Sequence, residues 1–449
     1  MAVVGGGFSG TLTAVQLLRR ADPGTRVLLI ERSGDFGPGV AYGTPDDRHV
    51  LNVPAARMSA CADEPDDLVG WAGVALDAYL PRRVFGEYLR ARLAAAAARS
   101  AARLERMTGE VRRIRPAPGA LELVLDGGRH VACDRAVLAL GALPAAAPCE
   151  LPGDPRVVAD PWRPGALAAV ADALRGGTPA HAVLIGSGPT AVDVALTLCG
   201  EAPGATVTLV SRHGRLPFAH LPGLRAPAPP PILPAGPLRL RTLERVLRAH
   251  VAQAERAGYD WRDAVDGLRP LVPRLWAALP DADRRAFADG ANRAWEIRRH
   301  RLAPAVAAEL AALRRAGRLR VVRGAVAGVD ARLTVRSANG AALRADAVVA
   351  CAGPGRDMRA AQPLLCGLLA DGHASADPLG LGLRSAPDGA LLDRRGRAGD
   401  RLWTLGALRR GELWESTAVR ELRDQAAIVA TGVCASLAQP ADAPLAVPA

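Results

Sequence analysis

Lysine does not occur in this chain of 449 residues, so its 57 basic residues other than histidine are all arginine. This absence excludes a lysine that binds phosphate in a Walker-type loop and a lysine that forms a Schiff base, and it leaves arginine to hold any anionic ligand. Aromatic residues make up only 4% of the chain, and no basic run is interleaved with them. Despite the net charge of +12, we therefore expect no nucleic-acid binding.

Closely spaced cysteines are also missing. The seven cysteines are scattered along the chain, and no two form a C-x-x-C pair. This spacing excludes the dithiol that two-dinucleotide proteins of the disulfide reductase kind need, and it favours free thiols in a reducing compartment. The eight histidines share no spacing with cysteines or acid pairs, so we predict no metal site.

Long apolar runs are absent as well. No uninterrupted apolar stretch reaches about 18 residues, so the sequence predicts no membrane span. No signal peptide precedes the first motif, which begins at Gly5. We therefore expect a cytoplasmic protein, and the sequence leaves open whether it forms a homo-oligomer.

The chain does contain two glycine-rich turns, each between an apolar strand and a helix. The first is Gly5-x-Gly7-x-x-Gly10, which follows the short strand 2–4. In a βαβ dinucleotide site the first glycine permits a tight turn and the second lets the backbone approach the pyrophosphate. The third lets the helix pack closely on the strand. The next strand, 27–30, ends at Glu31, where a carboxylate accepts hydrogen bonds from ribose hydroxyls.

The second turn is Gly186-x-Gly188-x-x-Ala191, and its following strand, 206–210, is succeeded by Ser211 and Arg212. An acid at this position would repel a 2′-phosphate, whereas Arg212 can pair with it, so the motif predicts NADPH rather than NADH. Two nearby side chains are expected to help: His213 and Arg215. The alternative is a solvated basic loop. The residue at the ribose position is acidic after the first turn and basic after the second. This difference indicates two different dinucleotides and electron transfer between them.

These patterns predict an α/β fold with two Rossmann-like dinucleotide-binding domains of the three-layer ββα type, the second inserted in the first. A helix is expected over 81–105 and paired strands at 111–114 and 121–125. Residues 346–438 are expected to re-enter the first domain, because Val348 to Gly353 repeats the pattern at Leu138 to Gly141. The expected segments are a first domain at 1–150 and 346–438, a second at 151–345 with a helical insertion at about 222–316 that roofs the space between domains, and a disordered tail at 439–449.

Several ordered motifs carry a resemblance to a known family. They are Gly-x-Gly-Phe8-Ser9-Gly10, Glu31-Arg32, Gly39-x-Ala41-Tyr42, His49-x-Leu51-Asn52-Val53-Pro54, Met58-Ser59-Ala60, Trp295-x-x-x-Arg299-His300-Arg301, Cys351-x-Gly353-Pro354 and Leu413-Trp414-Glu415-Ser416-Thr417-Ala418. Across nearly its whole length the chain resembles a bacterial family of FAD/NAD(P)-binding proteins. It resembles more distantly the flavin-dependent N-hydroxylating monooxygenases that act on amines and amino acids.

The resemblance implies that the first motif holds FAD, that the Val111 backbone contacts the adenine, and that the second motif holds NADPH. Many two-dinucleotide flavoproteins carry an acid for the flavin's ribityl chain after a late strand; here Gly406 is followed by Ala407, so we expect backbone contacts there. The expected cofactor-binding residues are Gly5, Gly7, Phe8, Ser9, Gly10, Glu31, Arg32, Val111, Gly141, Gly186, Gly188, Pro189, Thr190, Ser211 and Arg212.

The same resemblance implies an FAD-dependent monooxygenase, and we expect that NADPH reduces the flavin and that O₂ then adds to it. The resulting C4a-hydroperoxide would oxygenate a small nucleophile, an amine or amino acid. One alternative is an NADPH-dependent flavoprotein reductase or dehydrogenase that passes electrons on without oxygen insertion. Another is a non-catalytic module that senses redox state.

Three side chains are candidates for this chemistry, each with a structural alternative. Asn52 is placed to hydrogen-bond the peroxide or the nicotinamide amide, or else to cap its own loop. His49 is a candidate proton relay or a loop-stabilising residue. Arg301, with Arg299, is a candidate clamp for a carboxylate or phosphate, or else part of a solvent-facing helix.

Overall fold

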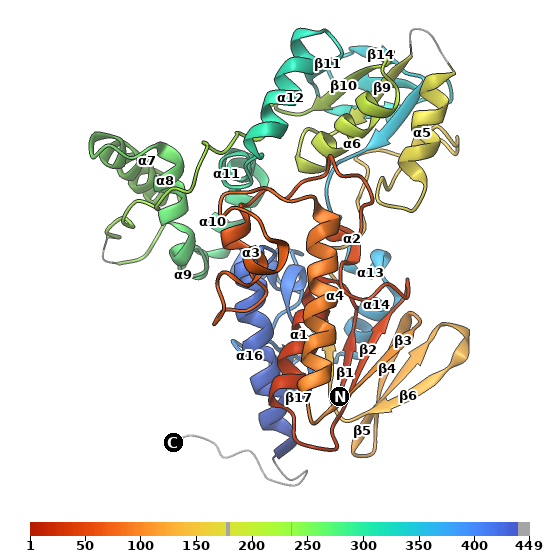
Figure 1. Ribbon diagram of the computed structural model, residues 1–449, viewed down its shortest axis with the longest axis vertical. Coiled ribbons are helices and arrows are strands. Elements are labelled where there is room, and N and C mark those ends of the chain that lie inside the picture. Colours follow the sequence, from red (N-terminus) through yellow and green to blue (C-terminus); the bar gives the residue numbers. More distant parts are fainter. Residues whose placement is uncertain (177–179, 235, 439–449) are drawn as a thin grey trace.

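The computed structural model describes residues 1–176, 180–234 and 236–438, so the expected tail at 439–449 lies outside the described residues. Two sheets organise the molecule (Figure 1). Within the described part of the chain, no helix is both long and apolar enough to cross a membrane.

The first sheet has six strands in the order β16-β17-β7-β1-β2-β3. Five run parallel, and only β16 is antiparallel to its neighbour. Their bounds are β1 (Ala2–Val4), β2 (Arg26–Glu31), β3 (Arg103–Thr108), β7 (Ala136–Leu138), β16 (Ala390–Leu392) and β17 (Ala398–Thr404). The expected helix over 81–105 was too long, because the chain turns after Arg99 and Ser100 Oγ donates to the Leu18 carbonyl at 2.6 Å. The segment that follows pairs with β2 as the edge strand β3.

Both faces of this sheet are covered, as the ββα prediction requires. Alternate side chains such as Val3 and Leu29 pack under helices, whereas Val4 and Ile30 face a three-stranded meander. The helices on the first face are α1 (Phe8–Arg20), α4 (Arg82–Arg99) and α16 (Val419–Ala438). The elements on the second face are β4 (Val111–Ala117), β5 (Ala120–Leu125), β6 (His130–Cys133) and α14 (Pro363–Asp371). Three short helices complete this domain: α2 (Gly39–Tyr42), α3 (Asp67–Ala72) and α13 (Met358–Ala361).

The second sheet is parallel throughout, in the order β11-β10-β9-β15-β8. Its strands are β8 (Val157–Val158), β9 (His181–Ile185), β10 (Thr206–Ser211), β11 (Leu319–Arg323) and β15 (Ala347–Ala350). Helices α5 (Ala166–Arg175), α6 (Pro189–Glu201) and α12 (Pro304–Arg315) cover one face. A second meander, β12 (Val326–Val329), β13 (Thr334–Ser337) and β14 (Ala342–Arg344), covers the other.

Two expected boundaries were therefore wrong. The strand β15, expected to re-enter the first domain from residue 346, pairs with β9 and β8 of the second sheet. A short apolar strand fits either parallel sheet, so its composition did not decide between them. The helix α12, expected in the insertion, packs on the second sheet and leads into β11. The chain passes between the domains twice, and the two crossings pair: Gly355 N–H donates to the Pro144 carbonyl at 2.9 Å.

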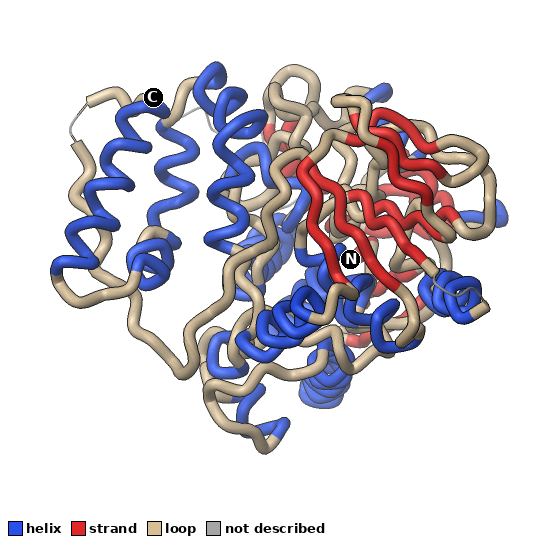
Figure 2. The backbone as a smooth tube through the Cα atoms, turned by 90° about the horizontal axis from the view of Figure 1, so that it is seen from above, coloured by secondary structure: helices blue, strands red, loops and turns tan. Residues whose placement is uncertain are grey.

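The helical insertion comprises α7 (Leu240–Arg256), α8 (Trp261–Gly267), α9 (Val272–Ala278), α10 (Asp281–Ala286) and α11 (Asn292–Arg299). Pro273 stands in the first turn of α9, where its missing N–H has no partner to lose. The insertion packs against the later part of the first domain, since Trp276 stacks on Trp414 with ring centroids 4.6 Å apart. Short α15 (Arg410–Leu413) precedes that contact. Figure 2 shows the strands gathered on one side, with a group of helices beside them.

Candidate functional site

The first glycine-rich turn lies between β1 and α1. Gly5 has a φ of +104°, and a Cβ there would stand 2.3 Å from the Ala139 carbonyl oxygen. A Cβ on Gly10 would stand 1.8 Å from the Gly5 carbonyl oxygen. Neither position has room for a side chain, so this turn requires glycine at both.

The N-terminus of α1 lacks a side-chain cap within the described residues. Its N-cap is Gly7, and no side chain caps the helix there. The first N–H groups of a helix without a cap are free to bind an anion, and the helix dipole favours negative charge at that end. The residues present therefore fit the pyrophosphate of a dinucleotide.

Glu31 ends β2 beside this turn. One carboxylate oxygen accepts from the Gly6 N–H at 2.7 Å, and the other accepts from the Ser33 N–H at 3.1 Å. The side chain is half-buried, so these bonds fix the carboxylate at the carboxyl end of the strand. This is where the sequence places a ribose acceptor.

The other predicted residues of the first motif are placed as follows. Phe8 is buried and packs on the rings of Tyr42 and Phe85, at 5.6 and 5.9 Å, so it supports the turn from beneath. Ser9 and Gly10 follow it in the first turn of α1. Arg32 is exposed, Val111 is buried at the start of β4, and Gly141 follows β7 with a φ of +70° and open space around it.

The late strand β17 leads to Gly406, which has a φ of +79°. The Gly406 N–H donates to Gln425 Oε1 of α16 at 2.9 Å. A Cβ on Gly406 would stand 3.3 Å from Ser9 Oγ, so this turn closes on the first motif. The expected backbone contacts to a flavin in this region remain a prediction.

The second turn repeats the first between β9 and α6. Gly186 has a φ of +132°, and its Cβ would stand 2.3 Å from the Cys351 carbonyl oxygen. Gly188 is the N-cap of α6, again without a side-chain cap, and Pro189 occupies the first turn, followed by Thr190. Ser187 Oγ donates to Ser211 Oγ at 2.8 Å, which ties the turn to the end of β10.

A cluster of guanidinium groups surrounds the end of β10. Arg212 is exposed beyond Ser211. The pKa of His213 is lowered by partial burial and then by four neighbouring positive charges, those of Arg212, Arg293, Arg215 and Arg323. We call these four arginines the arginine cluster. Sequence reasoning named two of them and missed Arg293 and Arg323.

A signal for one missed residue was present in the sequence. Arg323 ends β11, and the pairing places it opposite Ser211 of the parallel strand β10. Ends of neighbouring parallel strands meet at one edge of a sheet, so the end of the next strand was a candidate position. Arg293 gave no such signal, because it lies on α11, far along the chain from the turn that it contacts.

His49 sits between the two domains rather than open to a ligand. Its ring is 1% exposed, with Nδ1 2.6 Å from Thr44 Oγ1 and Nε2 2.9 Å from Thr197 Oγ1 of α6. Burial lowers the pKa of His49. Beside it, Arg82 of the first domain pairs with Asp193 of α6 at 2.8 Å. These contacts match the loop-stabilising alternative, and the proton-relay role stays a prediction that they do not favour.

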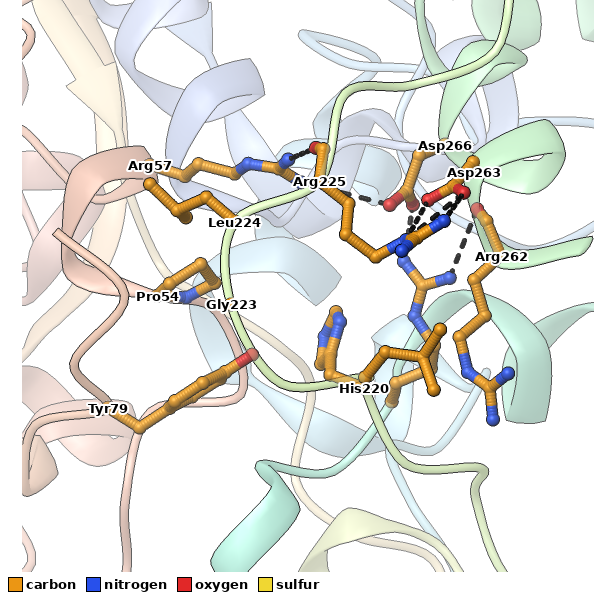
Figure 3. Close-up of a pocket in the computed structure, with 12 residues that line it drawn as sticks. Pro54, Arg57, Tyr79, His220, Gly223, Leu224, Arg225, Arg262, Asp263 and Asp266 are labelled. Carbon is orange, nitrogen blue, oxygen red and sulfur yellow. Dashed lines mark hydrogen bonds and ion pairs between the residues drawn. The ribbon is translucent and has the colours of Figure 1, made fainter. Parts of the chain in front are cut away.

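Arg301 lines a hollow of about 20 Å³, whose lining residues are drawn in Figure 3, and Asn52 lies outside that lining. The Asn52 carbonyl accepts from His220 Nε2 at 3.0 Å, and His220 lines the hollow with Tyr79 of the first domain. Burial, followed by the charge of Arg301, lowers the pKa of His220 to about 4. The hollow thus joins the first domain to the insertion, whose Arg262, Asp263 and Asp266 line its other side.

Arg301 is not on a solvent-facing helix. It is 2% exposed, follows α11 and pairs with Asp266, while its Nη1 donates to the Arg262 carbonyl at 3.2 Å. Its Nε is buried without a hydrogen-bond partner among the described residues. Arg299 is also buried and lies 3.4 Å from Glu415 Oε2. The solvent-facing alternative was therefore wrong for both arginines, and the clamp role remains a prediction.

One group of ligand-type atoms occurs near the surface: Cys61, Asp63 and Glu64 lie within 4.8 Å of one another. Arg19 Nη2 donates to Cys61 Sγ at 3.3 Å, and Arg19 also pairs with Asp63 at 3.7 Å. Because a guanidinium already neutralises the group, we read it as an ion-pair cluster.

A comparison with models of protein families matches the segment that contains the first turn. Residues 2–143 match the family model described as FAD-NAD(P)-binding. This segment is a FAD-NAD(P)-binding domain. No curated protein sequence matches the chain.

Solved structures resemble the chain over its whole length at low identity. Reduced ornithine hydroxylase from Pseudomonas aeruginosa is 18% identical, with a TM-score of 0.60 over 97% of this chain and 98% of that chain. Ornithine N-hydroxylase from Kutzneria sp. 744, solved with reduced FAD, NADP⁺ and L-ornithine, is 18% identical, with a TM-score of 0.57 over 96% and 98%. Thioredoxin reductase from T. acidophilum is 10% identical, with a TM-score of 0.51 over 98% of both chains. These likenesses confirm the fold of a two-domain flavoprotein.

Proposed function

We propose that this protein is an FAD-dependent oxidoreductase that consumes NADPH and inserts oxygen into a small nucleophilic substrate, an amine or amino acid. One observation carries the proposal: a single chain presents two dinucleotide turns at the carboxyl ends of two parallel sheets, with a carboxylate at one ribose position and an arginine at the other. In the balanced reaction, NADPH, a proton, O₂ and substrate yield NADP⁺, water and the oxygenated substrate.

FAD supplies the redox and oxygen chemistry when bound, while the chain positions the reactants and excludes water. Glu31 and the uncapped start of α1 would hold FAD, and the start of α6 with Arg212 would hold NADPH. Arg301, at the hollow between the first domain and the insertion, would face an anionic group of the substrate. The hollow holds only about 20 Å³, room for about one water molecule, so a substrate would have to displace the side chains that line it.

The cysteines support oxygenation over disulfide reduction. All seven are free thiols, and no two are bonded. Burial raises the pKa of Cys351, whose carbonyl contacts the second turn, so this thiol is held protonated rather than as a reactive thiolate. The second candidate is a reductase that passes electrons to a quinone or partner protein, because such a reaction needs no dithiol.

Two measurements separate the candidates. Purified protein should carry yellow flavin, and NADPH should bleach it under nitrogen; a chromophore that stays yellow contradicts both enzymatic functions. The reduced protein is then mixed with oxygen in a stopped-flow instrument while a panel of amines and amino acids is supplied. An oxygenase gives a spectrally distinct species before reoxidation and one oxygenated product per NADPH consumed. Single-phase reoxidation with every substrate favours the reductase.

A further inference from the structure

The helical insertion reaches the second dinucleotide turn through one side chain. Arg293 of α11 donates from Nη2 to the Ser187 carbonyl at 3.1 Å and to the Arg215 carbonyl at 2.7 Å. Ser187 stands between the two glycines of the turn. The insertion therefore contacts the second turn directly, although Arg293 and Ser187 lie about a hundred residues apart in the sequence.

These bonds leave most of the guanidinium unused. The three hydrogen bonds that Arg293 makes within the described residues all leave from Nη2, the third going to Ser187 Oγ at 3.2 Å. A guanidinium has five N–H donors, so Nη1 and Nε remain available. No carboxylate of the described chain lies within ion-pair distance of Arg293.

The free edge points to the place where phosphate is expected. Nη1 lies 3.9 Å from the position that a Cβ on Gly188 would occupy, and apart from Gly188 and its two neighbours in the chain no other described atom lies within 4 Å of that position. Gly188 is the residue whose missing side chain lets the backbone approach the pyrophosphate. The open space above Gly188 is thus bordered by an unpaired cation on one side and by the start of α6 on the other.

The charge of Arg293 has an unfavourable setting without a ligand. Burial lowers the pKa of Arg293, the carboxylate of Glu296 on the same helix raises it, and the positive charge of Arg212 lowers it. Glu296 is itself paired with Arg410 at 3.1 Å. A half-buried guanidinium next to like charges is costly unless an anion compensates it. An anion that binds between Arg293 and α6 would remove that cost.

We propose that Arg293 is a cofactor-binding residue supplied by the helical insertion, and that its free Nη1 edge binds the pyrophosphate of the nicotinamide dinucleotide. This inference rests on the proposed function. Its role differs from that of Arg212, which is assigned to the 2′-phosphate. Because the pyrophosphate is common to NAD⁺ and NADP⁺, Arg293 contributes to the binding of both, and Arg212 only to NADP⁺.

The test measures dissociation constants of NADP⁺ and NAD⁺ on the flavin-loaded full chain by titration calorimetry. Arg293→Gln should weaken both dinucleotides by the same factor, about ten- to hundredfold, the loss expected for a charge-assisted hydrogen bond. Arg293→Lys keeps the charge and a donor for the turn, and it should lose a smaller factor, again equal for both. Arg298→Gln is the matched control: Arg298 lies on the same helix, donates to the Ala294 carbonyl and lies over the Phe218 ring, and none of these contacts involves the second turn.

Flavin content and melting temperature show whether each variant is folded, and Arg293→Lys keeps the test valid if the glutamine variant is not. Unchanged affinity in the folded variants overturns the inference. A loss confined to NADP⁺ also overturns it, because that result moves the contact to the 2′-phosphate. If the parent protein binds NADP⁺ and the variants do too, only this inference fails; if the parent binds neither dinucleotide, the proposed function fails with it.

Discussion

The two glycine-rich turns differ in how far the rest of the chain closes over them. Over the first, the Gly37 N–H donates to the Gly6 carbonyl at 2.8 Å, and a Cβ on Gly7 would stand 3.2 Å from Gly39. Over the second, a Cβ on Gly188 would meet only the end of the Arg293 side chain. The first turn is roofed by its own domain and the second is open on that side.

The polar groups differ in the same way. Glu31 is already fixed by backbone and side-chain donors, whereas Arg212 is exposed beyond its strand. A roofed turn with a fixed ribose acceptor suits a cofactor that stays bound, and an open turn with exposed cations suits one that exchanges. We infer that the first unit retains FAD through many turnovers and that the second exchanges NADPH in each.

The substitution with the largest expected effect is at Gly10, the last glycine of the first turn, and it tests how closely α1 packs on that turn. Gly10→Ala places a Cβ 1.8 Å from the Gly5 carbonyl oxygen, so we expect a loss of about 3 kcal/mol or more in the free energy of unfolding, with loss of flavin. Ala191→Gly is the reverse change in the second unit, and it should cost only about 1 kcal/mol. Denaturant unfolding and flavin absorbance measure both. A Gly10→Ala protein that keeps its flavin and stability would contradict the packing argument.

Gly188→Ala tests the open turn. A methyl group fits there without a clash, so the free energy of unfolding and the flavin content should stay unchanged. The same methyl group blocks the approach of the pyrophosphate to the backbone, so NADP⁺ binding should weaken by about a hundredfold or more. Gly7→Ala, whose Cβ would press on Gly39, should instead disturb both flavin content and stability. Equal behaviour of the two variants would remove the difference between roofed and open turns.

The sequence was sufficient for the turns because their chemistry is local. Gly5 and Gly186 need a positive φ and touch a backbone carbonyl, so hardly any other residue can stand there. The apolar strands on either side of each turn likewise predicted the two parallel sheets. The sequence did not predict which sheet the strand β15 joins, because a short, buried, parallel strand fits either one. Arg293 was beyond prediction, because its function depends on how the insertion docks and not on any spacing.

Substitution of Arg212 and of Glu31, the residues at the two ribose positions, tests which cofactor each unit binds. Arg212→Gln should weaken NADP⁺ by about ten- to hundredfold and leave NAD⁺ unchanged, because only the 2′-phosphate loses its partner. Glu31→Gln should weaken FAD while leaving the ratio of NADP⁺ to NAD⁺ affinity unaltered. Titrations with each cofactor measure these effects. An Arg212→Gln protein that keeps its preference for NADP⁺ would transfer the 2′-phosphate to the other members of the arginine cluster.

Acidification tests the contact between the first domain and the segment around His220. The pKa of His220 is about 4 in the folded protein, below its ordinary value of 6.5. As the pH falls from 6.5 to 4, the unfolded chain takes up a proton that the folded chain does not. The free energy of unfolding therefore decreases over this range, and the full contribution of the neutral imidazole is present only above pH 6.5. His220→Gln keeps a donor for Asn52 and should reduce that decrease by about 1–2 kcal/mol. His373→Gln is the control, because the His373 ring makes no hydrogen bond or ion pair within the described residues. An unchanged pH profile in His220→Gln would contradict the burial argument.

The smallest expected effect is the response to salt. Arg212, Arg215 and Arg323 of the arginine cluster are exposed, so dissolved ions screen their attraction for a 2′-phosphate. The first turn would hold its ligand mainly by backbone N–H groups that are covered by the protein. Raising the ionic strength from 0.05 to 0.5 M should weaken NADP⁺ by roughly threefold more than NAD⁺, with no release of flavin. In Arg212→Gln the two nicotinamide dinucleotides should respond alike. Because salt changes no side chain, this comparison separates the charge of the cluster from its packing: an equal response in the parent protein would mean that the arginines discriminate by shape and hydrogen bonding rather than by charge.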